Sequence, residues 1–169
     1  MTPLSYALLG LVRMQPRSGY ALRKVFETTP LGDYSSSPGS IYPALKSLEK
    51  AGMVQARDAR DVRGKGLYHL TAEGEEALVK WLHAPVGDLG EAMLRFAYFG
   101  VDDLDAIPPF LDSFEAAAEA QAAGLAAFLA GDPAQAMSRE SRMAVEHGRR
   151  RLEASAEWAR WARGQYRAR

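Results

Sequence analysis

Apolar residues recur with the period of a helix in three short segments at the start of the chain. Thr2 and Pro3 are typical start residues for the first helix, whose apolar positions are Leu4, Ala7, Leu8, Leu11 and Val12. Pro16 ends this helix, and Ser18 caps a second one. We expect four residues of the second helix to face inward: Tyr20, Ala21, Val25 and Phe26.

A third helix is predicted over residues 38–51, with Ser37 as its cap and Gly52 as its terminator. The period then changes to that of a strand. Residues 54–57 and 67–70 are predicted to pair as a hairpin across a polar, glycine-containing loop. The first 70 residues are therefore expected to form three helices followed by two strands.

Proline and glycine mark a boundary near residue 85, after a fourth helix that Thr71 caps. Beyond it, a short helix is expected over residues 91–99. A longer helix follows, with repeating positions at Ile107, Phe110, Leu111, Phe114, Ala118, Gln121, Leu125 and Phe128.

The last helix is expected over residues 134–166, with an inner stripe of Val145, Gly148, Leu152, Ala156, Ala159 and Tyr166. It has few large apolar residues for its length, so it needs a partner surface to be stable. The predicted fold class is mainly α with a two-stranded wing. Residues 1–84 would form a winged helix-turn-helix domain that binds DNA, and residues 85–169 a helical dimerisation domain.

Charge is segregated along a chain whose formal net charge is zero. Residues 1–70 carry ten Lys and Arg against five Asp and Glu, a net +5. Residues 71–138 carry two against twelve, a net −10, and residues 139–169 carry nine against four, a net +5. A basic head and an acidic body fit a polyanionic partner. Chance variation among solvated faces gives the same totals, so charge alone leaves both interpretations open.

Composition excludes several classes of protein. The chain contains no Cys, which rules out disulfides, thiolate catalysis and Cys-based zinc sites. No apolar run approaches the roughly 18 residues that span a membrane. No basic residue precedes the apolar N-terminal stretch, as one would in a signal peptide. We therefore expect a cytoplasmic protein without a membrane partner, and its 47% hydrophobic residues suffice for a folded core.

The residues that commonly carry catalysis do not cluster in this sequence. The histidines are His69, His83 and His147, and no metal-ligand spacing relates them. No glycine-rich phosphate loop follows a strand, and the carboxylate pairs stand where charged helix starts are expected. We predict no catalytic residue, no metal site and no cofactor.

Three short helices followed by a hairpin are typical of the winged helix-turn-helix, whose third helix enters the major groove of DNA. On this third helix, the packing face is Ile41, Ala44, Leu45 and Leu48. The opposite face, which we expect to meet phosphates and base edges, consists of Gly39, Tyr42, Lys46 and Lys50, with Ser40 beside it.

Further contacts with phosphates or the minor groove are predicted for cations outside the third helix. The wing would supply Arg57, Arg60, Arg63 and Lys65, and the second helix Arg23 and Lys24. Each of these groups also has a purely structural interpretation. Tyr42 would pack against a neighbouring loop, and the lysines and arginines would be ordinary solvated charges.

Four stretches of the chain resemble the PadR family of transcription regulators: LSYALLGLV, SGYALRKVFE, SPGSIYPALKSLEKAGMV and GLYHLTAEGEEAL. The third, with Ile-Tyr-Pro-Ala-Leu-Lys after a Ser-Pro-Gly start, is the most specific. A later stretch, GEAMLRFAYFG, resembles the segment that opens the C-terminal region of the longer PadR subfamily, which is related to virulence-activator regulators. Beyond residue 100 the resemblance consists of helical pattern and length.

The resemblance implies a homodimer that C-terminal helices clasp together and that binds an inverted-repeat operator in double-stranded DNA, usually as a repressor. Carried over by position, the contacting residues are Ser40, Tyr42, Lys46 and the wing residues Arg63 and Lys65. Some members of the family release DNA on binding a small planar or phenolic effector. The aromatic candidates here are Trp81, Phe96, Tyr98, Phe99, Trp158 and Trp161, most of which we expect to be structural.

The alternative function is a winged helix that contacts another protein and does not bind DNA. Such domains tend to lose the basic face of the third helix and the wing, and this sequence keeps both.

Overall fold

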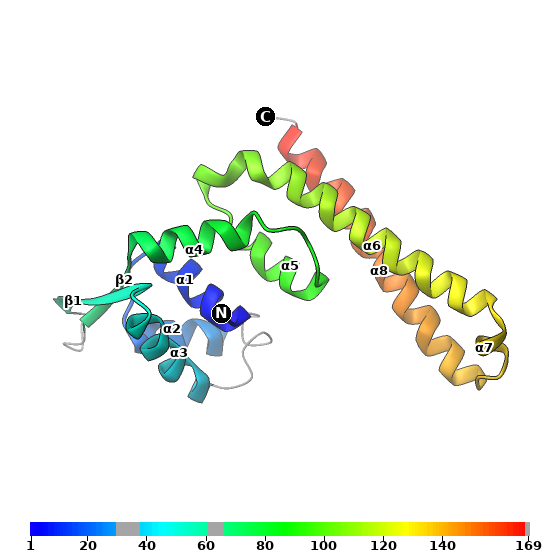
Figure 1. Cartoon of the computed structure of the whole chain (residues 1–169), viewed down its shortest axis with the longest axis horizontal. Helices are drawn as coiled ribbons and strands as arrows, with labels where there is room; N and C mark the ends of the chain where they lie inside the picture. The colour runs from blue at the N-terminus through cyan, green and yellow to red at the C-terminus, as the bar shows by residue number, and fades with distance from the viewer. Residues whose placement is uncertain (30–37, 61–65, 168–169) are drawn as a thin grey trace. The chain divides into compact units, whose positions relative to one another are not determined.

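A computed structural model of the chain describes residues 1–29, 38–60 and 66–167 (Figure 1). The chain divides into two compact units. The first consists of Met1–Ala84 with Met93–Gly100, and the second of Pro85–Ala92 with Val101–Arg169. The assignment of residues 1–84 to DNA binding and of residues 85–169 to dimerisation stays a prediction.

The first unit contains four of the predicted helices and both strands, in this order: α1 (Pro3–Met14), α2 (Gly19–Thr28), α3 (Pro38–Lys50), β1 (Val54–Arg60), β2 (Gly66–Leu70) and α4 (Ala72–Leu82). Three predicted caps are confirmed. The side-chain oxygens of Thr2, Ser18 and Thr71 accept hydrogen bonds from backbone amides three residues later, at 3.2, 3.3 and 3.0 Å. Gly52 has φ of 73°, the left-handed conformation that ends α3.

The core of the first unit joins the inner faces of α1 to α4. Its fully buried members include Leu8 and Leu9 on α1, Leu22 on α2, and Ile41 and Leu45 on α3. The predicted inner face of α2 is partly wrong. Leu22 is fully buried, whereas three residues predicted to face inward are only half-buried: Tyr20, Ala21 and Val25. The helix is therefore rotated so that Leu22 and Phe26 form its inner edge.

The two strands pair antiparallel, with Val54 opposite Leu70 and Arg57 opposite Leu67. Both are longer than predicted, and the register is irregular between Arg57 and Arg60. Arg17, in the connection between α1 and α2, adds an isolated bridge to Tyr68. Its backbone amide and carbonyl pair with those of Tyr68 at 3.4 and 2.9 Å, so this one residue extends the two-stranded sheet beside β2.

Helix α5 spans Leu89–Phe96, two residues earlier at its start than predicted and three at its end. The Met93–Gly100 segment packs in the first unit. Tyr98 is 5% exposed and its ring lies directly over Gly10, where a Cβ atom would be 2.3 Å from the ring. Arg95 is 4% exposed and donates to the carbonyls of Leu82, at 2.9 Å, and Ala84. Its guanidinium group thereby caps the C-terminal end of α4.

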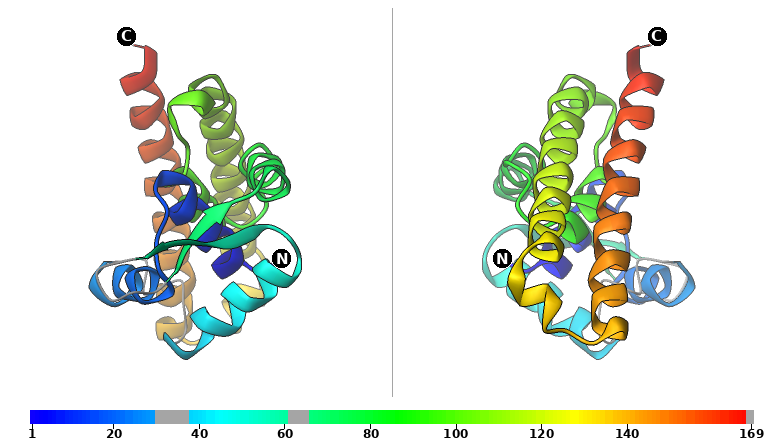
Figure 2. Two further views of the ribbon diagram at one scale, coloured as in Figure 1. Left: turned by 90° about the vertical axis from the view of Figure 1, so that its left-hand side faces the viewer. Right: turned by 90° about the vertical axis from the view of Figure 1, so that its right-hand side faces the viewer.

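The second unit continues with η2 (Val101–Ala106), α6 (Ile107–Ala130), α7 (Asp132–Gln135) and α8 (Arg139–Arg167). The two long helices lie side by side and run in opposite directions, with α7 at the turn (Figure 2). The prediction of one helix from residue 134 is wrong. Residues 132–135 form a separate turn of helix, and α8 begins at Arg139, where the Ser138 side chain accepts from the amide of Ser141 at 3.1 Å.

The interface between α6 and α8 pairs large side chains on α6 with alanines on α8. Phe110, Leu111 and Phe114 are buried on α6, and Ala156, Ala159 and Ala162 on α8. The expected repeat holds on α6 only as far as Ala118. Ala122 is the buried residue of the next turn, while Gln121 and Phe128 are exposed.

Ion pairs flank this interface, and their partners lie more than 40 residues apart in the sequence. Arg160 contacts Glu115 and Glu119 at 2.8 and 2.7 Å, and Arg163 contacts Asp112 and, at 2.8 Å, Glu115. Hydrogen bonding from Arg160 is the largest cause that holds the pKa of Glu115 below its usual value, and Arg163 lowers it further.

The predicted fold class, mainly α with a two-stranded wing, is confirmed. Within the described ranges, no helix combines the length and apolar character that crossing a membrane requires.

Candidate nucleic-acid interface

Helix α3 presents the predicted division into two faces. Ile41, Leu45 and Leu48 are buried at 3% exposure or less, and Ala44 is half-buried. The opposite side is open to solvent, with Gly39, Tyr42, Lys46 and Lys50 all exposed and Ser40 half-buried beside them. The spacing of apolar residues therefore placed the predicted recognition residues on the solvent-exposed side of the helix, with Ser40 at its edge.

Tyr42 has a fixed position as well as an exposed ring. It is 40% exposed, and a Cβ atom at Gly19 would lie 3.0 Å from its Cε1 atom. The ring thus rests against the first residue of α2. The loop of residues 30–37, which precedes α3, lies outside the described residues. Gly19 is a positioning residue that sequence reasoning missed, because the contact joins two helices that the pattern cannot orient against each other.

The exposed side of α3 is not purely basic. Glu49 is exposed between Leu48 and Lys50. Burial raises the pKa of Tyr68 on β2, and the electrostatic effects of Glu49 and Tyr42 raise it further. Tyr68 therefore stays a neutral hydrogen-bonding group near the end of α3, and Glu49 lowers the positive potential there.

Part of the predicted wing contact is described by the structure. Arg57 is exposed on β1, and its Nε and Nη2 atoms lie 2.6 and 2.5 Å from the side-chain amide of Gln55 when that amide presents its oxygen. The backbone of Arg60 belongs to β1. The side chain of Arg60, and Arg63 and Lys65 entirely, lie outside the described residues.

The two cations predicted on α2 differ in their surroundings. Arg23 is half-buried and pairs with Glu27 at 3.2 Å, with its guanidinium 5.7 Å from the centre of the Tyr20 ring. This pairing leaves it less free to meet a phosphate. Lys24 is exposed and keeps its charge available.

The aromatic residues considered for an effector are mostly packed inside one unit or the other. Trp81 stacks on Tyr6 with ring centroids 4.5 Å apart, and Trp158 meets Phe114 edge-on at 5.5 Å. Trp161 is the exception at 62% exposure.

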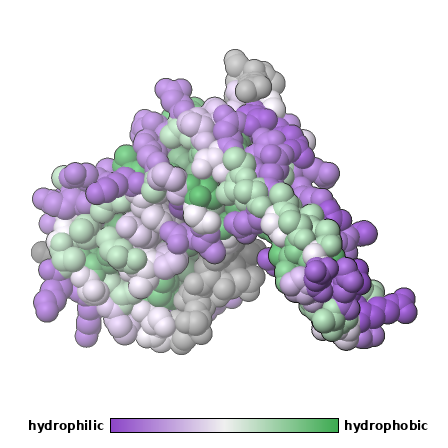
Figure 3. All heavy atoms as spheres, turned by 45° about the vertical axis from the view of Figure 1, so that its right-hand side comes forward, coloured by the Kyte–Doolittle hydropathy of each residue, from purple (hydrophilic) through white to green (hydrophobic). Residues whose placement is uncertain are grey.

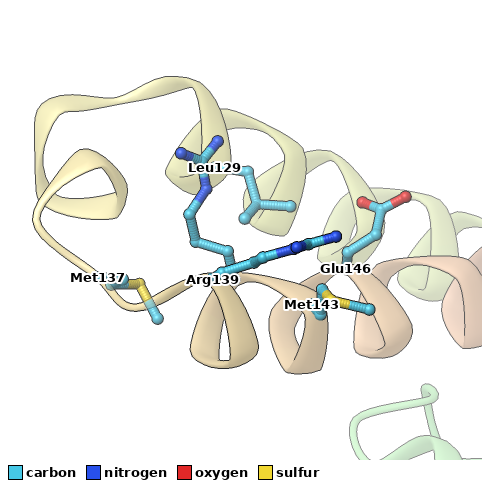
Figure 4. A pocket seen from close by; sticks show the side chains of 6 residues that line it. Leu129, Met137, Arg139, Met143 and Glu146 are labelled. Carbon is cyan, nitrogen blue, oxygen red and sulfur yellow. The ribbon is translucent and has the colours of Figure 1, made fainter.

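The second unit holds a separate cavity of about 590 Å³ between the end of α6 and the start of α8 (Figure 4). Leu129, Met137 and Met143 supply its apolar lining, and Arg139 and Arg142 its positive charge. Glu146 also lines it and bonds to Arg149 and Arg150, which lowers its pKa to about 2. A carboxylate therefore already stands among the cations of this cavity.

The three histidines lie in different parts of the structure. His69 lies in β2, His83 follows α4 with its ring 6.5 Å from Phe99, and His147 is exposed on α8. Among the described residues, no group of three or more His, Asp or Glu side chains is arranged to hold a metal ion.

Three helices, a paired wing and an exposed polar face on the third helix define a winged helix-turn-helix domain. Residues 8–80 match the Transcriptional regulator PadR-like family. The match covers 73 of the 169 residues and confirms the resemblance to this family drawn from the motifs. The family consists of transcription regulators and not of enzymes.

Two curated relatives agree with this assignment. Negative transcriptional regulator PadR of Bacillus subtilis is 36% identical over 107 residues, which cover 59% of this chain and 57% of the relative. Transcriptional regulator YqjI of Escherichia coli is 32% identical over 75 residues, covering 44% of this chain and 35% of the relative. The chain thus matches about half, or less, of the length of these relatives.

Three solved structures of transcription regulators align with nearly all of the chain. The PadR-like regulator BC1756 from Bacillus cereus is 22% identical, covers 98% of both chains and has a TM-score of 0.43. Bacillus subtilis PadR in complex with operator DNA is 25% identical, covers 96% of this chain and 98% of its own, and has a TM-score of 0.42. The Vibrio cholerae virulence activator AphA is 18% identical, covers 98% and 96%, and has a TM-score of 0.44.

Proposed function

We propose that this chain is a homodimeric, sequence-specific DNA-binding transcription regulator that represses by occupying an inverted-repeat operator. The observation that carries the proposal is the open face of α3, where Tyr42, Lys46 and Lys50 are exposed while the opposite face is buried. An α-helix of this kind fits the major groove, with lysines for phosphates and a tyrosine for base edges or sugar.

In a dimer, two such helices would enter successive major grooves roughly 34 Å apart, which matches the two halves of an inverted repeat. Occupying a promoter in this way blocks polymerase. The name of the Bacillus subtilis relative, a negative regulator, supports repression in preference to activation.

Exposed apolar side chains in the second unit support the dimer. Met143 is 61% exposed, Trp161 62% and Phe128 40%. On α6, an exposed stripe of alanines repeats at alternating intervals of four and three residues: Ala116, Ala120, Ala123 and Ala127. Figure 3 shows a band of hydrophobic residues along the paired helices α6 and α8, beside hydrophilic ones. Such a face loses apolar exposure when a second copy covers it.

We also propose that a small planar or phenolic effector releases the DNA. Only the family resemblance supports this part of the proposal. We assign no effector residue from that resemblance.

The proposal is tested first by selecting bound fragments from genomic DNA and measuring the affinity of the resulting operator against salt. Contacts with six to ten phosphates should lower affinity by roughly three to five orders of magnitude between 50 and 200 mM salt. Absent or salt-insensitive binding would instead support the alternative, a winged helix that binds another protein.

Point variants then test the face of α3. Tyr42→Ala and Lys46→Ala should abolish preference for the operator. Lys80→Ala, which removes an exposed charge from α4 in the same unit, should leave the preference intact. Normal operator binding by either α3 variant would refute the groove assignment. The dimer is tested by sedimentation equilibrium, where Trp161→Glu should raise the dissociation constant and Gln165→Glu should not.

A further inference from the structure

A groove in the first unit includes Lys24, one of the predicted DNA contacts, but its wall is mostly apolar. It is lined by the connection between α1 and α2, by one side of α2 and by Leu67 on β2. Its volume is about 490 Å³, within the range of about 300 to 1,000 Å³ that is usual for small-molecule sites. Apolar side chains form most of the wall: Pro16, Tyr20, Ala21, Val25 and Leu67.

The described lining of the groove carries positive charge only. Arg17 and Lys24 line it, and none of the described lining residues is acidic. Arg17 is half-buried, and its Nε atom is shielded from solvent without a hydrogen-bond partner among the described residues. A buried donor that stays unpaired is unfavourable, and a small shift of this half-buried side chain would let it donate to a ligand in the groove.

The position of Arg17 is fixed by the fold. Its backbone forms the bridge to Tyr68 on one side, and Ser18, the next residue, caps α2 on the other. The guanidinium group is therefore presented from a short stretch held at both ends. Such a pre-placed fork suits a carboxylate, which it can bind through two parallel hydrogen bonds.

We propose that this groove binds a small apolar anion, such as an aromatic carboxylate, with its carboxylate on Arg17 and Lys24 and its apolar body against Val25 and Leu67. A phosphate of DNA would use the two cations but not the apolar wall. The cavity between the end of α6 and the start of α8 (Figure 4) is a weaker candidate, because Glu146 already places a carboxylate there. Binding is measured without DNA, so this inference stands or falls separately from the proposed function.

The test is a titration of the ¹⁵N-labelled full chain with naphthalene-2-carboxylate, followed by amide chemical shifts at physiological salt. Naphthalene-2-carboxamide and inorganic phosphate serve as probes that lack the charge or the apolar body. We expect saturable shifts confined to residues 15–28 and 67–68. The carboxylate should bind on the order of tenfold more tightly than the carboxamide, since the ionic hydrogen bonds are lost with the neutral probe.

Variants assign the contact. Arg17→Gln should weaken the carboxylate on the order of tenfold, with a smaller loss for Lys24→Gln, because the lysine is the more solvated of the two cations. Arg151→Gln, an exposed arginine on α8, is the matched control and should bind as the unaltered chain does. Equal binding of carboxylate and carboxamide, displacement by phosphate, shifts centred on α8, or unchanged affinity in Arg17→Gln would each overturn the proposal.

Discussion

The ring of Tyr98 packs directly against Gly10 on α1. Whether Gly10→Ala destabilises or stabilises the first unit should therefore depend on the residue at position 98. A Cβ atom at Gly10 would lie 2.3, 2.5 and 2.8 Å from three ring carbons, against the 3.4–4 Å of ordinary contact. Tyr98 is 5% exposed, so its ring has little space into which to move. Overpacking of this kind costs about 1–3 kcal/mol, and the short distances place it near the upper value.

Replacing glycine by alanine within a helix also contributes about 1 kcal/mol of stability through helix propensity. Gly10→Ala should therefore lower the unfolding free energy of the first unit by about 2 kcal/mol, the difference between the two effects. Tyr98→Ala alone should cost about 3–5 kcal/mol. In that background the clash is gone, so Gly10→Ala should become stabilising by about 1 kcal/mol.

Tyr98→Phe is the matched control. The ring stays, so Gly10→Ala should remain destabilising in this background. The Tyr98 hydroxyl is buried without a hydrogen-bond partner among the described residues, and burial raises its pKa. Removing it should raise stability by about 1 kcal/mol.

The assay is hydrogen exchange of the buried α1 amides in the full chain, which reports on unfolding of the first unit alone. If Gly10→Ala stabilises α1 in all three backgrounds, the Met93–Gly100 segment does not cover α1, and the reasoning fails.

Three further predictions concern the two units separately. Arg95→Met should lower the urea stability of the first unit by about 1.5–3 kcal/mol, because it removes the hydrogen bonds that the charged guanidinium donates to the end of α4. A loss below about 0.5 kcal/mol would contradict the capping role. Ser18→Ala should cost about 1 kcal/mol through loss of the α2 cap, and an unchanged denaturation midpoint would argue against it. The lowered pKa of Glu115 means that its contribution is complete above pH 4.5, its ordinary pKa, and is lost as the pH falls below that value. When the melting temperature of the α6–α8 pair is plotted against pH, Glu115→Gln should reduce its fall at acid pH. Identical plots for the variant and the unaltered chain would refute the linkage.

Features that depend on neighbours within one or two turns of chain could be predicted from the amino-acid sequence. The caps at Thr2, Ser18 and Thr71, the stop at Gly52 and the two faces of α3 all follow from backbone hydrogen bonding and a period of 3.6 residues. For this reason the spacing of apolar residues alone was enough to place the predicted recognition residues on the open side of α3.

Which surfaces meet is a property of the tertiary structure. Packing selected Leu22 as the buried residue of α2, placed Tyr98 over Gly10 and rested Tyr42 on Gly19. It also buried Arg95 against the end of α4 and brought Arg160 to Glu115 across 45 residues. A period fixes which side of a helix is apolar. The neighbour that covers that side depends on packing and charge between segments distant in the chain, which no local pattern contains.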